Sequence, residues 1–442
     1  MESQNTIYVT TLAATGFLAL LLILLPRKYV MLPFILGACF IPADQRIIIA
    51  GLDFTPLRIL VFVGLLLMFT NRLQLRRSLN DFDLLVFTFA ISGAVIYYIQ
   101  WGTSTALIHQ SGVLFDIFGM YLIFTRGLGS WEAVRLSLKI FAVCSIVTAV
   151  FIALEWTTGK NAFVVLGKVH TVVREGRYRC EGPFPHSIIS GLFWGMLVPL
   201  FIGMAMTGKK KLLYLAATTA SIFIVAASAS STPLLSLVVV LAGVLLFKWR
   251  SYTPVANWCL VAGLTFLHFV MQKPVWHLLA RMDIIGGSTG WHRYILIDRA
   301  IKHFNEWAIL GYRSTEHWGW GMQDVTNQFV FEGVRGGIIT LIFFLALLFV
   351  MFRTTLRCSL RESTYNHRVL SWCFFVSLAG HCVSFLSVSY FGQIMMLWYM
   401  TLAVTAFLVR RAAFLSMEMI AAERQRKIID LPATFFPEQS NL

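Results

Sequence analysis

The sequence has few charged residues. Asp, Glu, Lys and Arg make up only 13% of its 442 residues, whereas 58% are hydrophobic and the mean hydropathy is +0.74. Soluble domains contain about 25% charged residues. The composition therefore excludes an ordinary soluble domain and indicates a protein with many membrane-spanning segments.

Several local signals are also missing. The seven cysteines are scattered, and no Cys-x-x-Cys or Cys/His spacing suggests a zinc site. Only Cys180 falls in a long loop that we place outside the membrane, so no intrachain disulfide is expected there. The first six residues carry no basic group, which argues against a cleaved signal peptide.

Long apolar runs are what the sequence has instead. Residues 7–25 and 212–230 each approach the ~20 apolar residues that a helix needs to cross ~30 Å of hydrocarbon. These runs are continuous and do not alternate, which favours helices over the strands of a barrel. We therefore predict an all-α polytopic membrane protein of 12–13 transmembrane helices, with spans near 7–25, 29–42, 56–70, 84–101, 106–125, 133–155, 187–206, 212–229, 232–248, 254–271, 329–352, 369–388 and 394–410.

The basic residues orient this bundle. The chain has 36 Lys and Arg against 21 Asp and Glu, a net charge of +15. Such an excess can indicate nucleic-acid binding, but here the cations gather in alternate connections, as the positive-inside rule describes. We therefore expect no nucleic-acid partner and place the N-terminus outside and the C-terminus inside. The connections assigned to the inside contain Arg27, Arg72, Arg126, Lys209, Arg250 and Arg353, among others.

Two long outer connections, 156–186 and 272–328, break this charge rule. Long loops can cross a membrane regardless of their charge. Alternatively, their cations bind an anion that arrives at the outer leaflet, because arginine forks match phosphate oxygens in pairs. The cations in question are Lys160, Lys168, Arg174, Arg177, Arg179, Lys273, Arg281, Arg293, Arg299, Lys302 and Arg313.

The first outer loop runs directly into an apolar segment. Pro183 and Pro185 prevent a helix before His186, so the next span is expected to begin near Ser187. A helix N-terminus carries unpaired N–H groups and partial positive charge. Arg179 and its neighbour Arg177 would stand beside that element and attract an anion. The other interpretation is that these arginines only anchor the chain to lipid head groups.

The second outer loop contains a predicted amphipathic helix over 291–310. Its apolar face would be formed by Tyr294, Ile297, Ile301 and Phe304, at helical spacing, and Arg293 would open it. Such a helix would lie over the bundle or along the membrane interface.

Polar residues follow this helix. His317 and Asp324 are candidates for a general base, since an imidazole, or a carboxylate whose pKa is raised by burial, can take up a proton near neutral pH. Each can also be merely structural. Arg335 lies where the next span enters the membrane, where an ionisable group suggests function. It can equally form a neutral i,i+3 pair with Glu332.

The ordered set of these segments resembles the O-antigen ligase/polymerase superfamily of bacterial membrane glycosyltransferases. The resemblance is clearest over about 170–350. It consists of RCEGPFPHSIISGLF at the start of a span, STGWHRYILIDRAI and the glycine-rich ILGYRSTEHWGWG in the later outer loop, and NQFVFEGVRGGIITLIFF where the chain re-enters the membrane.

This resemblance implies a GT-C-type helical bundle in the bacterial cytoplasmic membrane that works without a metal or other cofactor. It implies a polyprenyl-diphosphate-linked oligosaccharide donor, membrane lipids as neighbours, and a glycan, lipid or protein acceptor. Arg179 (or Arg177) and Arg293 would hold the pyrophosphate. The ligase branch has a histidine before an asparagine here, but Thr326 precedes Asn327 in this chain. The base would then be His317 or Asp324, or absent.

We count His186, Asn327 and Arg335 as further substrate-binding candidates. The only Asp-x-Asp motif, 81–83, lies on the predicted inner side, and we interpret it as a solvated helix start. The main alternative function is a lipid-linked glycan transporter (a flippase), which would favour ionisable groups deep in spans. Its candidates are Asp116, His268 and His381.

The expected organisation divides the chain into six parts. These are N-terminal transmembrane helices (1–155), a first outer loop (156–186), central transmembrane helices (187–271), a large outer loop (272–328), C-terminal transmembrane helices (329–411) and a cytoplasmic tail (412–442).

Overall fold

The computed structural model describes residues 7–49, 52–70, 79–168, 171–174, 176–281 and 289–429. Two short antiparallel hairpins are present, β1 (Ile47–Ile49) with β2 (Leu52–Phe54) and β3 (Val172–Arg174) with β4 (Arg177–Arg179). The rest is helical: α1 Val9–Leu24, α2 Met31–Phe40, α3 Pro56–Phe69, α4 Asp81–Trp101, α5 Ser104–Gly127, α6 Trp131–Thr158, α7 Ser187–Thr207, α8 Lys211–Ala227, α9 Ser231–Leu245, α10 Thr253–Val270, α11 Thr289–Lys302, α12 Phe304–Trp307, α13 Gln328–Arg361, α14 Tyr365–Phe385 and α15 Gln393–Ile429.

Every predicted span coincides with one of these helices. In the described part of the chain, eight helices are long and apolar enough to cross a membrane, and one of them is the continuous stretch Ser231–Val270, which contains α9 and α10. Helices α1, α3 and α8 are apolar but shorter. The prediction of an all-α polytopic membrane protein is therefore confirmed.

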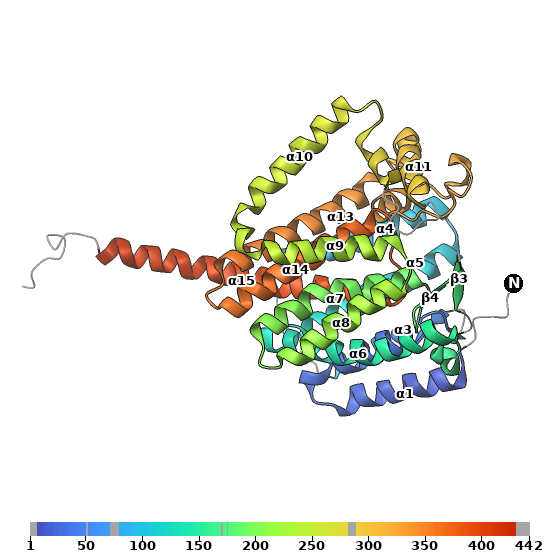
Figure 1. The fold of residues 1–442 in the computed structure, drawn as a ribbon, viewed down its shortest axis with the longest axis horizontal. Helices are drawn as coiled ribbons and strands as arrows, with labels where there is room; N and C mark the ends of the chain where they lie inside the picture. Colours follow the sequence, from blue (N-terminus) through green and yellow to red (C-terminus); the bar gives the residue numbers. More distant parts are fainter. Residues whose placement is uncertain are drawn as a thin grey trace, which may run out of the picture.

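The helices run roughly side by side, and the long connections gather at one end of the bundle (Figure 1). We call this the loop end; it carries β3, β4, α11 and α12. The opposite end carries the extension of α15. Helix α10 leans away from the other helices, and none of its side chains is buried.

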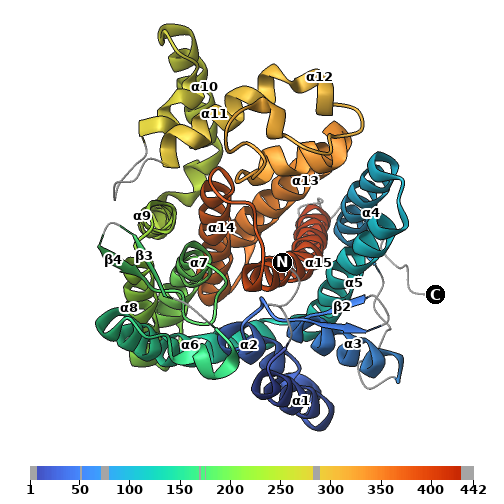
Figure 2. The same cartoon turned by 90° about the vertical axis from the view of Figure 1, so that its right-hand side faces the viewer.

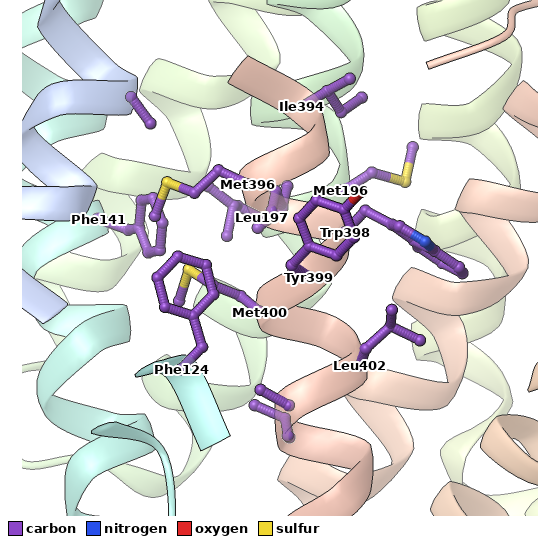
Figure 3. Close-up of a cluster of buried hydrophobic side chains, with 14 of the residues drawn as sticks. Phe124, Phe141, Met196, Leu197, Ile394, Met396, Trp398, Tyr399, Met400 and Leu402 are labelled. Carbon is purple, nitrogen blue, oxygen red and sulfur yellow. The ribbon is translucent and has the colours of Figure 1, made fainter. Parts of the chain in front are cut away.

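Helix α7 lies at the centre of the packed helices, between α8, α9 and α14 (Figure 2). It is the most deeply buried of the eight long helices. Side chains of α7 meet those of α5, α6 and α15 in a dense cluster of aromatic, methionine and aliphatic groups (Figure 3). In a membrane, such van der Waals packing is a main source of helix association.

Helix α7 begins where the prolines predicted. His186 is extended, and its Nδ1 accepts a hydrogen bond from the Ile188 N–H at 3.1 Å, so the side chain caps the helix that starts at Ser187. The cap leaves other N–H groups of the first turn directed to the loop end.

The Asp-x-Asp motif starts α4, as expected, but only its first aspartate, Asp81, is exposed to solvent. Asn80 and Asp83 form a reciprocal capping box, in which each side chain accepts the other residue's N–H at 2.8 Å. Asp83 is buried and also accepts a hydrogen bond from the Tyr121 hydroxyl. The expectation of a solvated motif therefore holds for Asp81 and is wrong for Asp83, because Tyr121 of α5 covers that carboxylate.

The amphipathic helix of the second loop is shorter than predicted and turned differently. It ends at Lys302, and the separate α12 follows His303. Arg293, Leu296 and Ala300 form its buried face, whereas Ile301 is exposed. The predicted apolar face relied on long apolar side chains such as Ile301, whereas in the structure the small Ala300 and Arg293 pack inward.

Helix α13 is interrupted near its start. Gly336 and Gly337 have non-helical backbone angles, and Gly337 has φ +66°. The freed N–H of Ile338 donates to the Ala308 carbonyl at 2.8 Å, which fixes the break against the end of α12. A side chain at 337 would collide with Ile309, so this approach requires glycine. Arg335 consequently lies just before the break.

Candidate functional site

The β3–β4 hairpin separates the two candidate arginines of the first loop, Arg177 and Arg179. Arg177 and Tyr178 are exposed, whereas Arg179 is only 8% exposed. Sequence alone left both arginines as candidates. Their different burial makes Arg179 the one that faces the interior.

The segment after Arg179 is held firmly by the bundle. The buried Glu155 carboxylate of α6 accepts the N–H groups of Glu181 and Gly182 at 3.0 and 2.9 Å. The Cys180 N–H donates to the Ala227 carbonyl at 3.1 Å. Lys168 forms an ion pair with Glu181 at 3.0 Å. These contacts fix the position of the Arg179 main chain.

The Arg179 guanidinium has little compensation for its burial. Its Nε is buried without a hydrogen-bond partner, and among the described residues it forms no ion pair. Burial and the nearby charge of Arg174 lower its pKa, an effect that Glu181 partly opposes. Because a buried charge is costly unless it is paired, this group is suited to an anionic ligand.

Arg293 reaches the same region from α11. It is 7% exposed, and its Nη2 donates to the Thr232 hydroxyl at 2.8 Å. Thr232 lies in the first turn of α9. The second-loop arginine is therefore fixed against the N-terminus of α9, at a buried threonine.

The junction between α8 and α9, residues 227–232, brings these elements together. The Ala227 carbonyl accepts a hydrogen bond from the N–H of Cys180, the residue directly after Arg179. The Thr232 hydroxyl accepts one from Arg293. Ser230 is the N-cap residue of α9, but its side chain makes no hydrogen bond to the first turn of the helix. Ala229, just before it, has a left-handed φ of +44°. We call Arg179, Arg293 and this junction the arginine site. A helix N-terminus and two buried arginines are all attractive to an anion.

Helix α7 packs directly against the junction. A Cβ placed on Gly191 would lie 2.7 Å from the Ser228 hydroxyl and 2.8 Å from a Pro233 carbon. His186, at the start of the same helix, has its pKa lowered to about 4 by burial and by the charges of Arg179 and Lys168. His186 is thus a neutral cap beside the arginine site.

A large cavity opens elsewhere at the loop end. It has a volume of about 700 Å³, and its lining includes Asp324, Glu332 and Arg335. A second cavity of about 710 Å³, lined partly by His317, shares Tyr312 with the first. Arg179, His186 and Arg293 line neither of them. The predicted site residues therefore form two groups.

Within the cavity group, the predicted residues differ in their availability. The Asp324 side chain makes no hydrogen bond or ion pair with any described residue, and it is exposed to the cavity. Arg335 pairs with Glu332 at 2.8 Å, as the i,i+3 spacing indicated. Asn327 is buried and caps α13, and its amide also donates to the Leu386 carbonyl. Both of its polar atoms are thus used within the fold.

His317 belongs to a cluster that the sequence analysis did not identify. Its Nε2 lies 2.8 Å from Glu306 Oε2, and His303 Nδ1 lies 2.7 Å from Glu306 Oε1. Burial acts to raise the pKa of Glu306, but hydrogen bonds from Trp318, His303 and His317 lower it to about 2. The i,i+3 spacing of His303 and Glu306 could have predicted their contact from the sequence. His317 reaches Glu306 only through the tertiary fold, which the sequence pattern does not indicate.

Two of the three transport candidates, Asp116 and His381, have partners inside the bundle. Asp116 accepts a hydrogen bond from Arg58 Nε at 2.9 Å. The buried His381 Nδ1 lies 2.6 Å from the Tyr390 hydroxyl. His268 accepts a longer contact from the Val275 N–H at 3.4 Å. These contacts give Asp116 and His381 Nδ1 structural partners, whereas the His268 contact is exposed.

In comparisons with known proteins, the chain matches no family model and no curated protein.

Proposed function

We propose that this chain is a membrane glycosyltransferase that transfers or polymerises a polyprenyl-diphosphate-linked glycan at the outer face of the bacterial cytoplasmic membrane. The observation that carries the proposal is the arginine site: Arg179 is buried and has no ion-pair partner among the residues that the structure describes, and Arg293 is fixed at the N-terminus of α9. Its position at the loop end, where most long connections gather, fits a substrate presented at one membrane face.

In the proposed reaction, an acceptor hydroxyl attacks the anomeric carbon of the donor sugar. The bond from that carbon to the diphosphate oxygen breaks, and the polyprenyl diphosphate leaves with the electron pair. Arg179 and Arg293 stabilise the charge that develops on the diphosphate, which is a strong contribution in a partly dry site.

The acceptor proton passes to a base in this reaction. Asp324 is the better candidate, because its carboxylate is unpaired among the described residues. It lines the large cavity, which the arginine site does not, so the reaction requires the donor sugar to extend from the arginine site into that cavity. The ring nitrogen Nε2 of His317 is already engaged by Glu306.

The test is a transfer assay with purified protein in detergent, a polyprenyl-diphosphate-linked oligosaccharide and candidate acceptors. Arg179→Ala and Arg293→Ala are expected to lower the transfer rate about 100-fold or more, and Asp324→Asn should lower it strongly. Lys160→Ala and Arg299→Ala are matched controls, because these cations are exposed in the same two loops.

Detergent also separates transfer from transport, since it removes the membrane barrier. Full transfer by both arginine variants, at normal protein levels, would exclude the arginine site as the donor site. A wild-type protein that transfers nothing in detergent, yet moves lipid-linked glycan across a vesicle membrane, would support the flippase instead.

A further inference from the structure

His303, Glu306 and His317 converge at the loop end. One potential ligand atom from each residue lies within 4.8 Å of the others. His303 precedes α12, Glu306 lies in it, and His317 comes from the 3-10 turn η5 (Glu316–Trp318). The cluster therefore joins two segments of the chain, because His317 follows Glu306 by eleven positions.

A buried tryptophan holds these side chains in place. The Trp318 Nε1 donates to Glu306 Oε2 at 3.1 Å, and its indole stacks on the His303 ring with centroids 5.4 Å apart. Trp318 is 1% exposed and packs with Leu296 and Ala300 of α11. The carboxylate and one imidazole are thus oriented by the core of the outer loop.

The ligand set is that of a transition metal. Two imidazoles and one carboxylate are typical of zinc sites that keep a fourth position open. Glu306 and His317 are partly exposed, which leaves room for a water molecule at that position. Ligands of tetrahedral zinc lie about 3.3 Å apart, so the two His–Glu contacts need to lengthen by about half an ångström.

We propose that His303, Glu306 and His317 bind one divalent transition-metal ion, with Zn²⁺ as the best match. The ion would link η5 to α12. It would thereby restrain residues 312–314, which connect these two elements and line both cavities. This is a structural role, and the transfer reaction proposed above needs no metal. The inference stands on the cluster alone and is independent of the proposed function.

The test uses the full chain purified without a histidine tag, stripped with a chelator and titrated with Co²⁺ and then Zn²⁺. We expect one equivalent of Co²⁺ to bind with the absorption of a four-coordinate site and to be displaced by Zn²⁺. Zn²⁺ should also raise the melting temperature of the wild-type protein.

His303→Gln and His317→Gln should each weaken binding at least tenfold and reduce the thermal shift. His277→Gln is the matched control, because this histidine lies in the same outer loop beside Lys273 and away from the cluster. The absence of saturable binding to the wild-type protein would overturn the proposal. Unchanged binding by the two variants would overturn it as well, and neither result depends on transferase activity.

Discussion

Arg293 of α11 donates a hydrogen bond from Nη2 to the hydroxyl of Thr232, 61 residues away in the first turn of α9, at 2.8 Å. This bond orients a buried guanidinium, so Thr232 acts as a positioning residue in the proposed site. Its contribution can be separated from that of the arginine charge, because the hydroxyl can be removed without changing the size of the side chain.

Thr232→Val is therefore expected to lower the transfer rate about tenfold, which corresponds to the loss of one hydrogen bond. Thr232→Ser keeps the hydroxyl and should restore most of the rate. Steady-state kinetics with varied donor concentration would show the loss mainly in kcat/KM for the donor. Equal rates for the valine and serine variants would remove the Arg293–Thr232 bond from the mechanism.

The approach of α7 to the α8–α9 junction gives a second prediction. Gly191→Ala should reduce transfer strongly, because the new Cβ would lie 2.7 Å from the Ser228 hydroxyl and displace the junction that holds Arg293. Gly195→Ala is the matched control one turn further along, where the nearest atom, of Val225, would be 3.4 Å away. Activity and melting temperature should be measured for both, and similar losses would argue against a special role for the junction.

His186 provides a prediction about pH. Its pKa is about 4 in the folded protein, because of burial and of the charges of Arg179 and Lys168, against about 6.5 when unfolded. Between pH 6.5 and pH 4, His186 is protonated in the unfolded chain but stays neutral in the folded protein. Stability contributed by this group is thus complete above pH 6.5 and falls as the pH drops to 4, by at most about 3 kcal/mol.

His186→Asn should remove this part of the pH dependence, while the asparagine still caps α7. The measurement is the melting temperature in detergent from pH 7.5 to 4, with the variant subtracted from the wild type. A difference that stays constant over this range would mean that His186 is not neutral and buried in solution.

The sequence was sufficient to predict where the apolar helices lie, because each depends on local information; of the 12–13 spans expected, eight helices in the described part of the chain are long and apolar enough to cross a membrane. Hydrophobic runs locate the helices, and Pro183 and Pro185 locate the start of α7. The i,i+3 spacing likewise predicted the pairing of Arg335 with Glu332. These features need no knowledge of the partner elements.

The arginine site could be predicted only in part. Sequence singled out Arg179 and Arg293 through their positive charge in loops predicted to lie outside, but the junction residues Ala227 and Thr232 lie 48 and 61 residues away from them in the chain. The His303–Glu306–His317 cluster was missed for the same reason, since Trp318 and α12 bring it together only after folding. Contacts of this kind depend on tertiary packing and leave no local pattern.

The last prediction concerns the orientation of the protein, on which the proposed function depends. The positive-inside rule places the loop end outside the cytoplasm. Lys302, at the end of α11, is 62% exposed, and Lys209, between α7 and α8 at the opposite end, is also exposed. Cys259 is the only exposed native cysteine, so Cys259→Ser gives a background that reacts little with a membrane-impermeant maleimide.

In this background, Lys302→Cys should be labelled on bacterial spheroplasts, whereas Lys209→Cys should be labelled only after the membrane is opened. Each variant serves as the control for the other, because both replace an exposed lysine in a connection between helices. The reverse pattern would place the arginine site in the cytoplasm. A lipid-linked glycan in the outer leaflet could not reach an arginine site on the cytoplasmic side. The reverse pattern would therefore exclude the proposed substrate.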